Sequence, residues 1–309
     1  MDIQISIIIV NYNTEEVLEK CLASIRNQVN NIGYEVIVVD NNSEKGSLAN
    51  LVSAFPEVNF MFLEKNLGFG MGNNAGAAMA RGKYLYLLNP DTVLVNNAPY
   101  ILHRYLEDKN NSQVAICNAS MYTPDMQPTS TYGNSDILLL EYKKLLNMKT
   151  HQRGINRTDK PVRVKELSGA NFFIRKKVFD EVGGFDKDFF MYYEEIDLCD
   201  RVRRKGYYIV SVPEAKVVHS YGASAENKNE TMRQWSREEH WYSKFVYFFK
   251  TKGKYQTALL YQANMLKLHT AVFFYSLQKN KSKLDYWNAK KQVIQKTYSR
   301  YKSYLNSKK

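Results

Sequence analysis

The stretch "YLYLLNPDTVL", residues 84–94, decides the fold class of this chain. It begins as an uninterrupted apolar run, the kind of strand that is buried on both faces of a sheet. Asn89 and Pro90 end the run, and Asp91 follows directly. Ligands of layered α/β sheets bind beyond the carboxyl ends of the strands, so a carboxylate delivered there is a candidate site residue.

Other apolar runs rich in β-branched residues alternate with helical patterns along the chain: "ISIIIV" (5–10), "EVIVVD" (35–40), "VNFMFL" (58–63) and "VAIC" (114–117). This order predicts an α/β fold with parallel strands and right-handed crossovers. Asn13 and Glu16 predict a capping box that opens a helix ending near residue 27. Asn11 and Asp40 end the first two strands, so we expect them at the same sheet edge as Asp91.

The glycine-rich stretch "NLGFGMGNNAG", residues 66–76, matches the dinucleotide pattern G-x-G-x-x-G/A and suggests an oxidoreductase. That pattern belongs in the first strand-to-helix turn, which here reads "VNYNTEE" and has no glycine. The glycines therefore indicate either a close backbone approach to a ligand or a loop with positive φ. The role of Asp40 also has two interpretations: its carboxylate either binds a ribose or base, or caps a helix or turn.

The stretch "FFMYYEEIDLCDRVRRKG", residues 189–206, predicts a helix that begins near Glu195. A surface face of i,i+4 ion pairs is expected on it, Asp197 with Arg201 and Asp200 with Arg204. Glu194 and Glu195 follow an aromatic run that lowers the local dielectric, a setting that suits a general base. His219 ends the short strand "KVVH" and is either a packed residue or a ligand.

Length, charge and cysteine content restrict the class of protein. The 309 residues, 44% of them hydrophobic, suffice for a full α/β domain and an extension. Residues 230–309 hold 17 Lys/Arg and 4 Asp/Glu, a net charge of +13, whereas the rest of the chain carries −1. Aromatic residues at helical spacing continue through this basic part, and we place a domain boundary near residue 226. The scattered cysteines and the lack of a long apolar run favour a cytoplasmic protein without a membrane span.

Seven segments together resemble those of inverting family 2 glycosyltransferases of the GT-A fold, especially the bacterial rhamnosyltransferase-like members. They occur in the family's order across about residues 3–225: "SIIIVNYN", "VIVVDNNS", "NLGFGMGNNAG", "LLNPDTVL", "LSGANFFIRKKVFDEVGGFD", "FFMYYEEIDLCDRVRRKGY" and "VPEAKVVHSYGAS". The resemblance implies a nucleotide-sugar-binding sheet with flanking helices at 1–225, followed by a basic aromatic helical extension at 226–309.

The resemblance also implies roles for individual residues. Asn11, Tyr12, Asp40, Asn74 and Asn89 would line the nucleotide site. The family's metal motif is Asp-x-Asp; its first acid is replaced here by Asn89, which leaves Asp91, with His219, as ligands of Mn²⁺ or Mg²⁺. The general base would be Glu195, with Glu194 beside it. The segment near the acceptor and donor sugar would be Ser168, Gly169, Ala170 and Asn171.

The implied reaction transfers a sugar from a nucleoside diphosphate to a hydroxyl of a saccharide or lipid-linked saccharide, in cell-surface polysaccharide synthesis. Rhamnose from dTDP-rhamnose is the first choice of donor, a UDP-sugar is the alternative, and a dinucleotide-dependent oxidoreductase is a distant one. No nucleic-acid-reading motif accompanies the basic tail, so nucleic acid is not an expected partner. The tail instead suggests either docking on an anionic inner membrane surface, or packing and homo-oligomerisation.

Overall fold

The computed structural model describes residues 2–44, 46–133, 137–146, 148, 154–156, 159–220 and 230–308. It divides into two units, each formed by more than one stretch of the chain. The sheet unit comprises Met1–Ser135, His151–Lys187 and Glu194–Asn227, and the helical unit comprises Asp136–Thr150, Asp188–Tyr193 and Lys228–Lys309. The boundary expected near residue 226 falls in 221–229, outside the described residues, and stays a prediction.

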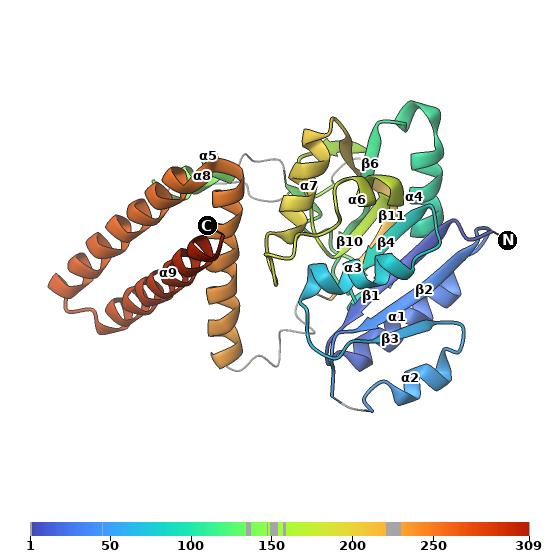
Figure 1. Ribbon diagram of the computed structural model, residues 1–309, viewed down its shortest axis with the longest axis horizontal. Helices are drawn as coiled ribbons and strands as arrows, with labels where there is room; N and C mark the ends of the chain where they lie inside the picture. The colour runs from blue at the N-terminus through green and yellow to red at the C-terminus, as the bar shows by residue number, and fades with distance from the viewer. Residues whose placement is uncertain are drawn as a thin grey trace. The chain divides into compact units, whose positions relative to one another are not determined.

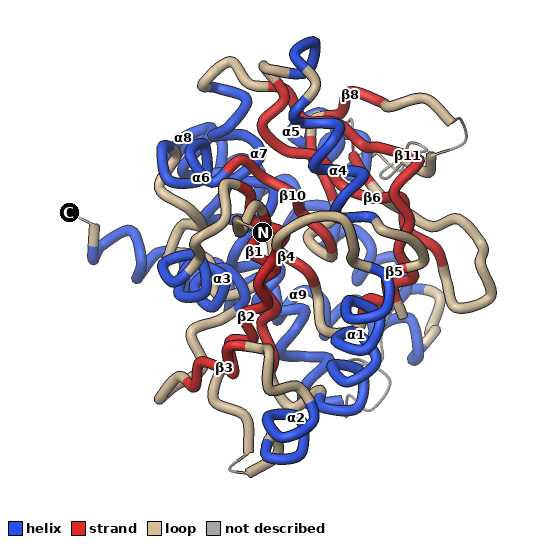
Figure 2. Tube along the Cα trace, turned by 90° about the vertical axis from the view of Figure 1, so that its right-hand side faces the viewer, coloured by secondary structure: helices blue, strands red, loops and turns tan. Residues whose placement is uncertain are grey.

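The first half of the sheet unit follows the predicted alternation. Strands β1 (Ile5–Asn11), β2 (Tyr34–Asp40), β3 (Asn59–Phe62) and β4 (Tyr84–Leu88) pair in parallel in the order β3-β2-β1-β4. The connections carry helices α1 (Glu15–Gln28), α2 (Ala49–Ala54) and α3 (Phe69–Met79). Figure 2 shows α1 and α3 on opposite sides of these strands. The predicted α/β fold class is confirmed.

Beyond β4 the sheet is mixed, although the five strands predicted from apolar runs all run the same way. Strand β10 (Asn171–Arg175) runs antiparallel between β4 and β6 (Val114–Tyr122). Strand β11 (Tyr208–His219) is parallel to β6 and pairs antiparallel with β5 (Thr92–Leu94) and β8 (Val162–Val164). An apolar run indicates that a strand is buried but does not indicate the direction in which the strand runs.

The strand directions bring five chain segments to one edge of the sheet, which we call the site edge. It contains the ends of β1, β2, β4 and β11, which run the same way, and the start of β10, which runs the opposite way. Asn171 at the start of β10 lies opposite Leu88 at the end of β4. The remaining elements of this unit are α4 (Ala98–Glu107), a 3₁₀ turn (Lys109–Asn111), α6 (Lys176–Glu181), α7 (Glu194–Arg204) and the strand pair β7 (Tyr132–Gly133) and β9 (Glu166–Leu167).

Two hydrophobic layers bury the two faces of the sheet. Ile5, Ile7 and Ile9 of β1 pack with buried residues of α1 and α4, while Ile8 and Val10 pack in a second cluster with α3, α6 and α7. Successive side chains of a strand point to opposite faces, so one uninterrupted apolar strand serves both layers. This explains why the runs in the sequence show no polar alternation.

The predicted capping box at the start of α1 was wrong. The helix begins at Glu15 after Thr14, and no side chain caps it. Asn13 instead has a φ of 52°, and its Oδ1 accepts a hydrogen bond from the backbone N of Glu44 at 2.9 Å. An asparagine tolerates this left-handed conformation, and its amide secures the loop after β2.

From Phe69 onward the glycine-rich stretch forms helix α3, so the predicted loop with positive φ holds only for Gly68, and a close approach to a ligand stays a prediction. A Cβ atom on Gly72 would lie 2.8 Å from Cγ1 of Val10, and one on Gly76 would lie 2.5 Å from Cγ2 of Ile8. Gly68, whose φ is 82°, directly precedes the helix. The glycines inside the helix therefore let α3 lie close against β1, which is a packing role.

The helical unit contains α5 (Ile137–Leu145), α8 (Glu230–Leu277) and α9 (Lys281–Ser307). Gly253, with φ 83° and ψ 171°, breaks α8, and Figure 1 shows the helix turning sharply before α9 returns beside its second part. The core is aromatic: the rings of Tyr261 and Tyr298 stack at 3.8 Å, and Phe245 and Tyr301 pack beside Tyr298. No helix among the residues described is long and apolar enough to cross a membrane.

A short segment from the middle of the chain, residues 188–193, belongs to this unit. Asp188 accepts hydrogen bonds from Tyr304 at 2.9 Å and Lys308 at 3.1 Å, and forms an ion pair with Lys250 at 2.5 Å. Ser243 donates a hydrogen bond to the backbone oxygen of Met191 at 2.8 Å. The helical unit is therefore more than a continuous C-terminal extension.

Candidate active site

Asn11 and Asp40, at the ends of β1 and β2, form one hydrogen-bonded pair. Nδ2 of Asn11 donates to Oδ1 of Asp40 at 3.1 Å and to Oγ of Ser43 at 3.1 Å. The backbone N of Ser43 donates to Oδ2 of Asp40 at 3.2 Å. Both site side chains are buried, while the neighbouring Tyr12 is exposed. Each carboxylate oxygen keeps further acceptor capacity, so Asp40 can still bind a ribose hydroxyl or a base N–H.

Asn41 is a structural residue of this corner that the sequence analysis missed. Its Nδ2 donates to Oδ1 of Asn66 at 2.9 Å and to the backbone oxygen of Gly68 at 3.1 Å. Its Oδ1 accepts from the backbone N of Leu67 at 2.8 Å. This one amide joins the end of β2 to the turn before α3, and the polar triplet "DNN" was the signal that could have found it.

Asp91 and His219 meet at the site edge, although they lie far apart in the sequence. Both are buried, and Nε2 of His219 lies 3.1 Å from Oδ1 of Asp91. The antiparallel pairing of β5 with β11 produces this contact, because His219 lies opposite Thr92. The backbone N of Ser220 also donates to the backbone oxygen of Asp91 at 3.1 Å.

Asn89 lies in the turn between β4 and Asp91. Its backbone oxygen accepts from Oγ1 of Thr92 at 2.5 Å, and its backbone N donates to the oxygen of Ala170 at 2.9 Å. Its side-chain Oδ1 is buried and has no hydrogen-bond partner within the described part of the chain. A buried amide oxygen without a partner keeps its capacity to accept a hydrogen bond or to bind a cation.

The donor set fits a divalent cation completed by oxygen atoms of a bound ligand. Among the residues that the structure describes, no group of three His, Cys, Asp or Glu side chains forms a metal site. Asp91, His219 and the Oδ1 of Asn89 nevertheless offer donor atoms suited to Mn²⁺ or Mg²⁺, which are commonly held by one or two carboxylates plus substrate phosphates. Burial raises the pKa of the Cys21 thiol beneath this turn to about 12, so it supplies no thiolate.

The acidic pair begins helix α7 at Glu194, one residue earlier than predicted. Glu194 is buried and Glu195 is half-buried. Tyr192 and Tyr193, directly before the pair, both have a φ of 69°, which is an uncommon conformation for aromatic residues. A Cβ atom on Gly169 would lie 3.7 Å from Cβ and 3.8 Å from Cγ of Glu195, so the Gly169 backbone passes beside the stem of this side chain.

The predicted ion-pair face of α7 is partly corrected. Asp197 binds Arg201 at 2.7 Å as expected, but Asp197 is buried and not on the surface. Asp200 pairs with Arg203 at 2.7 Å, in place of the predicted Arg204. Residues three apart on a helix are neighbours just as residues four apart are, so the sequence could not distinguish the two partners.

Residues 168–171 link the two sides of the site. Ala170 accepts the hydrogen bond from Asn89, while Gly169 passes beside Glu195. The backbone N of Ser168 donates to the oxygen of Thr131 at 3.0 Å. Asn171 is buried, and its Oδ1 accepts from the backbone N of Ala119 at 2.7 Å. The structure thus brings the predicted sugar segment together with the predicted base and the turn of Asp91.

Asn74 makes two hydrogen bonds to the loop after α6. Its Nδ2 donates to the backbone oxygen of Phe185 at 2.8 Å, and its Oδ1 accepts from the backbone N of Phe185 at 2.9 Å. These bonds give the amide a clear structural role. Contact with a nucleotide stays a prediction for this residue.

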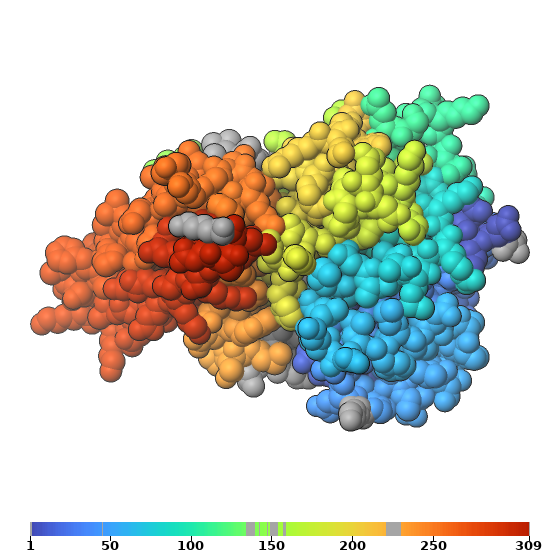
Figure 3. Space-filling model, viewed as in Figure 1, coloured from blue at the N-terminus to red at the C-terminus, as the bar shows by residue number. Residues whose placement is uncertain are grey.

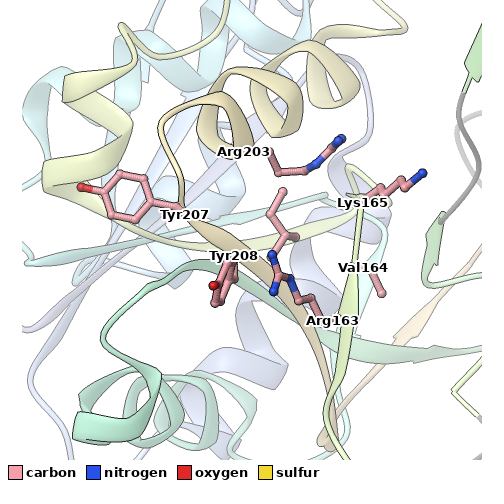
Figure 4. Close-up of a pocket in the computed structure, with 7 residues that line it drawn as sticks. Arg163, Val164, Lys165, Arg203, Tyr207 and Tyr208 are labelled. Atoms are coloured by element: carbon pink, nitrogen blue, oxygen red, sulfur yellow. The ribbon is translucent and has the colours of Figure 1, made fainter.

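A surface hollow of about 460 Å³ lies at the other end of β11 (Figure 4). Arg163, Lys165, Arg203, Tyr207 and Tyr208 line it together with apolar residues of β8 and β11. The Arg163 guanidinium lies 3.4 Å from the centre of the Tyr208 ring. Tyr208 begins the strand that His219 ends, so this hollow is separate from the site edge.

The sequence and the fold together identify the class of protein. The chain belongs to glycosyl transferase family 2, whose family model matches residues 6–183, more than half of the chain. A second family model, glycosyl transferase family group 2, matches residues 145–290. The resemblance to family 2 glycosyltransferases is confirmed.

Among curated proteins, the chain is similar to bacterial rhamnosyltransferases. It is 27% identical over 235 residues to the N-acetylglucosaminyl-diphospho-decaprenol L-rhamnosyltransferase of Mycobacterium tuberculosis, covering 69% of this chain and 75% of the relative. It is 26% identical over 228 residues to the rhamnosyltransferase WbbL of Escherichia coli, covering 69% of this chain and 82% of the relative. These similarities agree with the rhamnosyltransferase-like resemblance of the sequence.

A solved structure confirms the fold. The structure of GalNAc-T7 with UDP, GalNAc and Mn²⁺ superposes with a TM-score of 0.57 at 18% identity. The match covers 71% of this chain and 44% of the GalNAc-T7 chain, and it shows a likeness of fold.

Proposed function

We propose that this chain is an inverting glycosyltransferase that transfers rhamnose from dTDP-rhamnose to a hydroxyl of a saccharide or lipid-linked saccharide acceptor, in the synthesis of a cell-surface polysaccharide. One observation carries the proposal: a single sheet edge holds the Asn11–Asp40 pair, the Asp91–His219 pair and the loop beside Glu195. The similarity to two rhamnosyltransferases supports the choice of sugar.

On the donor side, Asp40 and Asn11 bind the base and ribose, and the exposed Tyr12 contacts the base. Asp91 and His219, with Oδ1 of Asn89, would hold the divalent ion. That ion, when bound, supplies positive charge against the diphosphate as the sugar–phosphate bond breaks. The buried positions of Asp91 and His219 keep these donor atoms fixed before the ligand arrives.

On the acceptor side, Glu195 removes the proton of the attacking hydroxyl. The acceptor oxygen bonds to the anomeric carbon while the bond to the diphosphate breaks on the opposite face, so the anomeric configuration inverts. Gly169 leaves room beside Glu195 because it has no side chain, and the neighbouring Ser168 and Ala170 would contact the sugars. Glu194 is the alternative base, since it begins the same helix.

The test is a donor screen with the full chain, in which nucleoside diphosphate release is measured with and without Mn²⁺. We expect saturable, Mn²⁺-stimulated release from dTDP-rhamnose and a rise in melting temperature with dTDP. If nucleoside diphosphate is released only from a UDP-sugar, the proposed transfer reaction stands but its donor is that UDP-sugar. If no nucleotide sugar reacts or stabilises the protein, the proposal fails. The oxidoreductase alternative is disfavoured, because the chain belongs to glycosyl transferase family 2.

A further inference from the structure

The second part of α8, residues 254–277, has an unpartnered apolar face. Its members are between 51% and 80% exposed and follow one another at spacings of four or seven residues: Tyr255, Leu259, Leu266, Phe273 and Leu277, with Phe274 beside them. Such spacings place side chains on one side of a helix. The opposite side is occupied, because Leu260, Met265 and Leu268 are buried within the helical unit. The helix is therefore apolar on two sides, and only one is covered by this unit's own packing.

The charges along this part of the chain are almost all positive. Residues 250–309 contain 14 Lys/Arg and a single acidic residue, Asp285. Exposed lysines flank both ends of the face: Lys252 and Lys254 at its start, and Lys279, Lys281 and Lys283 at its end. Exposed residues of 254–277 include no carboxylate. The partner that complements this surface is apolar and anionic.

We propose that this face of the α8–α9 hairpin docks on an anionic lipid bilayer. The exposed apolar side chains enter the boundary between headgroups and acyl chains, and the lysines bind the acidic headgroups. The face is about 33 Å long at 1.5 Å per residue, so the helix lies along the membrane surface. In Figure 3 the hairpin, in orange and red, protrudes from the rest of the helical unit at the α8–α9 turn. The inference is independent of the sugar and of the proposed transfer reaction.

A second copy of the chain is the alternative binding partner of this face, and the charges of the face disfavour such a dimer. Helices that pair through an apolar stripe usually place acidic residues against basic ones along its flanks. Two copies of this face would instead bring lysines near lysines, since no carboxylate of 254–277 is exposed. An anionic bilayer carries the opposite charge over the whole length of the face.

The experiment is vesicle sedimentation of the full chain, with phosphatidylcholine vesicles and with vesicles containing about 30% phosphatidylglycerol. One variant combines Phe273→Ser, Phe274→Ser and Leu277→Ser, and a second combines Lys279→Ala, Lys281→Ala and Lys283→Ala. The matched control combines Lys20→Ala, Lys109→Ala and Lys187→Ala, three exposed lysines of the sheet unit. All replaced side chains are exposed, so circular dichroism and melting temperature should stay unchanged.

We expect binding to the anionic vesicles that weakens as salt rises, and a loss of about tenfold in each of the first two variants. The control should bind within about twofold of the unchanged chain. Equal binding to neutral vesicles, or no binding to anionic vesicles at low salt, would overturn the proposal. Sedimentation velocity tests whether the face binds a second copy instead. The face would be assigned to a second copy if the chain forms a dimer, does not bind vesicles, and becomes a monomer when Phe273, Phe274 and Leu277 are replaced.

Discussion

Asp91 can be tested by removing one charge at nearly constant shape. Asp91→Asn should lower Mn²⁺-dependent transfer by about 10²-fold or more, because the ligand loses the negative charge that holds a divalent ion. Asp91→Ala should nearly abolish it. The fold should persist in both, since Asp91 lies in a turn after β4 and not among the apolar layers. The measurement is nucleoside diphosphate release alongside the thermal transition.

Asp125→Asn is the control for this change, because Asp125 is an exposed acid in a turn and hydrogen-bonds Thr123. Its activity should equal that of the unchanged chain. Full activity of Asp91→Ala, or loss of its thermal transition, would remove the assignment of Asp91.

Glu195→Gln should retain donor binding and lose turnover by about 10²-fold or more, since the amide cannot accept the proton while its shape is kept. Turnover is measured at saturating acceptor, and the dTDP dissociation constant is measured separately. Glu194→Gln is the matched comparison, one residue away on the same helix. If Glu194→Gln is the more damaging change, the base is Glu194.

At the residue scale, the sequence predicted positions better than partners. Asn11, Asp40 and Asp91 were placed at strand ends because a strand end can be recognised from its apolar run. The contact between Asp91 and His219 depends on the antiparallel pairing of β5 with β11, a long-range pairing that no local pattern encodes. Asn41 was missed for the same reason, since its three partners lie 25 to 27 residues further along the chain.

At the scale of one element, helix α3 offers a test in which packing and helix propensity predict opposite changes in the free energy of unfolding. Gly76→Ala should destabilise the protein by about 1–3 kcal/mol, because the new Cβ lies 2.5 Å from Ile8 and 3.0 Å from Val39 in a filled layer. Helix propensity alone would instead stabilise it by about 1 kcal/mol. Urea unfolding measures the difference. Ala78→Ser, at an exposed position of the same helix, is the control, and a stabilised Gly76→Ala would contradict the packing role.

The ion pair between α5 and α8 is buried and responds to pH. Nζ of Lys244 lies 2.9 Å from Oε2 of Glu141, and both side chains are 5% exposed. Burial alone would raise the pKa of Glu141, but Lys244 and Lys144 outweigh it and hold the pKa below its ordinary value. Stability from Glu141 is therefore present above the ordinary carboxyl value of about 4.3, and it is lost as pH falls through the lowered value.

Glu141→Gln should accordingly cost about 3–5 kcal/mol at neutral pH, because it leaves the Lys244 ammonium buried without its counter-charge. The deficit should shrink as pH falls below the ordinary carboxyl value of about 4.3, and it should vanish once the pH passes the lowered pKa of Glu141 in the folded protein. Thermal unfolding across this pH range measures both effects. Glu230→Gln, in an exposed pair with Arg237, should change stability by less than about 1 kcal/mol at any pH, and an equal deficit there would argue against a special role for the buried pair.

Elements were predictable where their pattern was local. The strand at 84–88 was placed at its observed bounds, and helix α1 ends within about one residue of the expected position. The antiparallel direction of β10 was not predictable, because its apolar run "NFFI" is compatible with either direction. The glycines of α3 were predicted either to approach a ligand or to form a loop with positive φ. Their place inside a helix depends on close contact with β1, which no local pattern encodes.

At the scale of the whole molecule, the helical unit is built from three stretches of the chain, and the sequence showed only the last of them. The charge pattern identified residues 230–309, since the net charge of +13 is confined there. Residues 137–145 and 188–193 carry no such compositional mark, and only their packing partners assign them to this unit. Their contacts form late in synthesis, when the C-terminal helices exist.

A chain that ends at residue 225 should therefore be less stable than the same residues are in the full chain. Phe189 and Tyr193 are buried in the full protein, and each aromatic side chain returned to water costs about 1.5–3 kcal/mol. Asp188 would also lose Tyr304, Lys308 and Lys250. We expect a lower melting temperature, aggregation on heating and weakened dTDP binding, measured by calorimetry and light scattering. Asp188→Asn in the full chain weakens only the contacts of Asp188, so it should lower stability less than the truncation does. A shortened chain that melts and binds dTDP as the full chain does would show that residues 1–225 fold alone, as the boundary near residue 226 predicts.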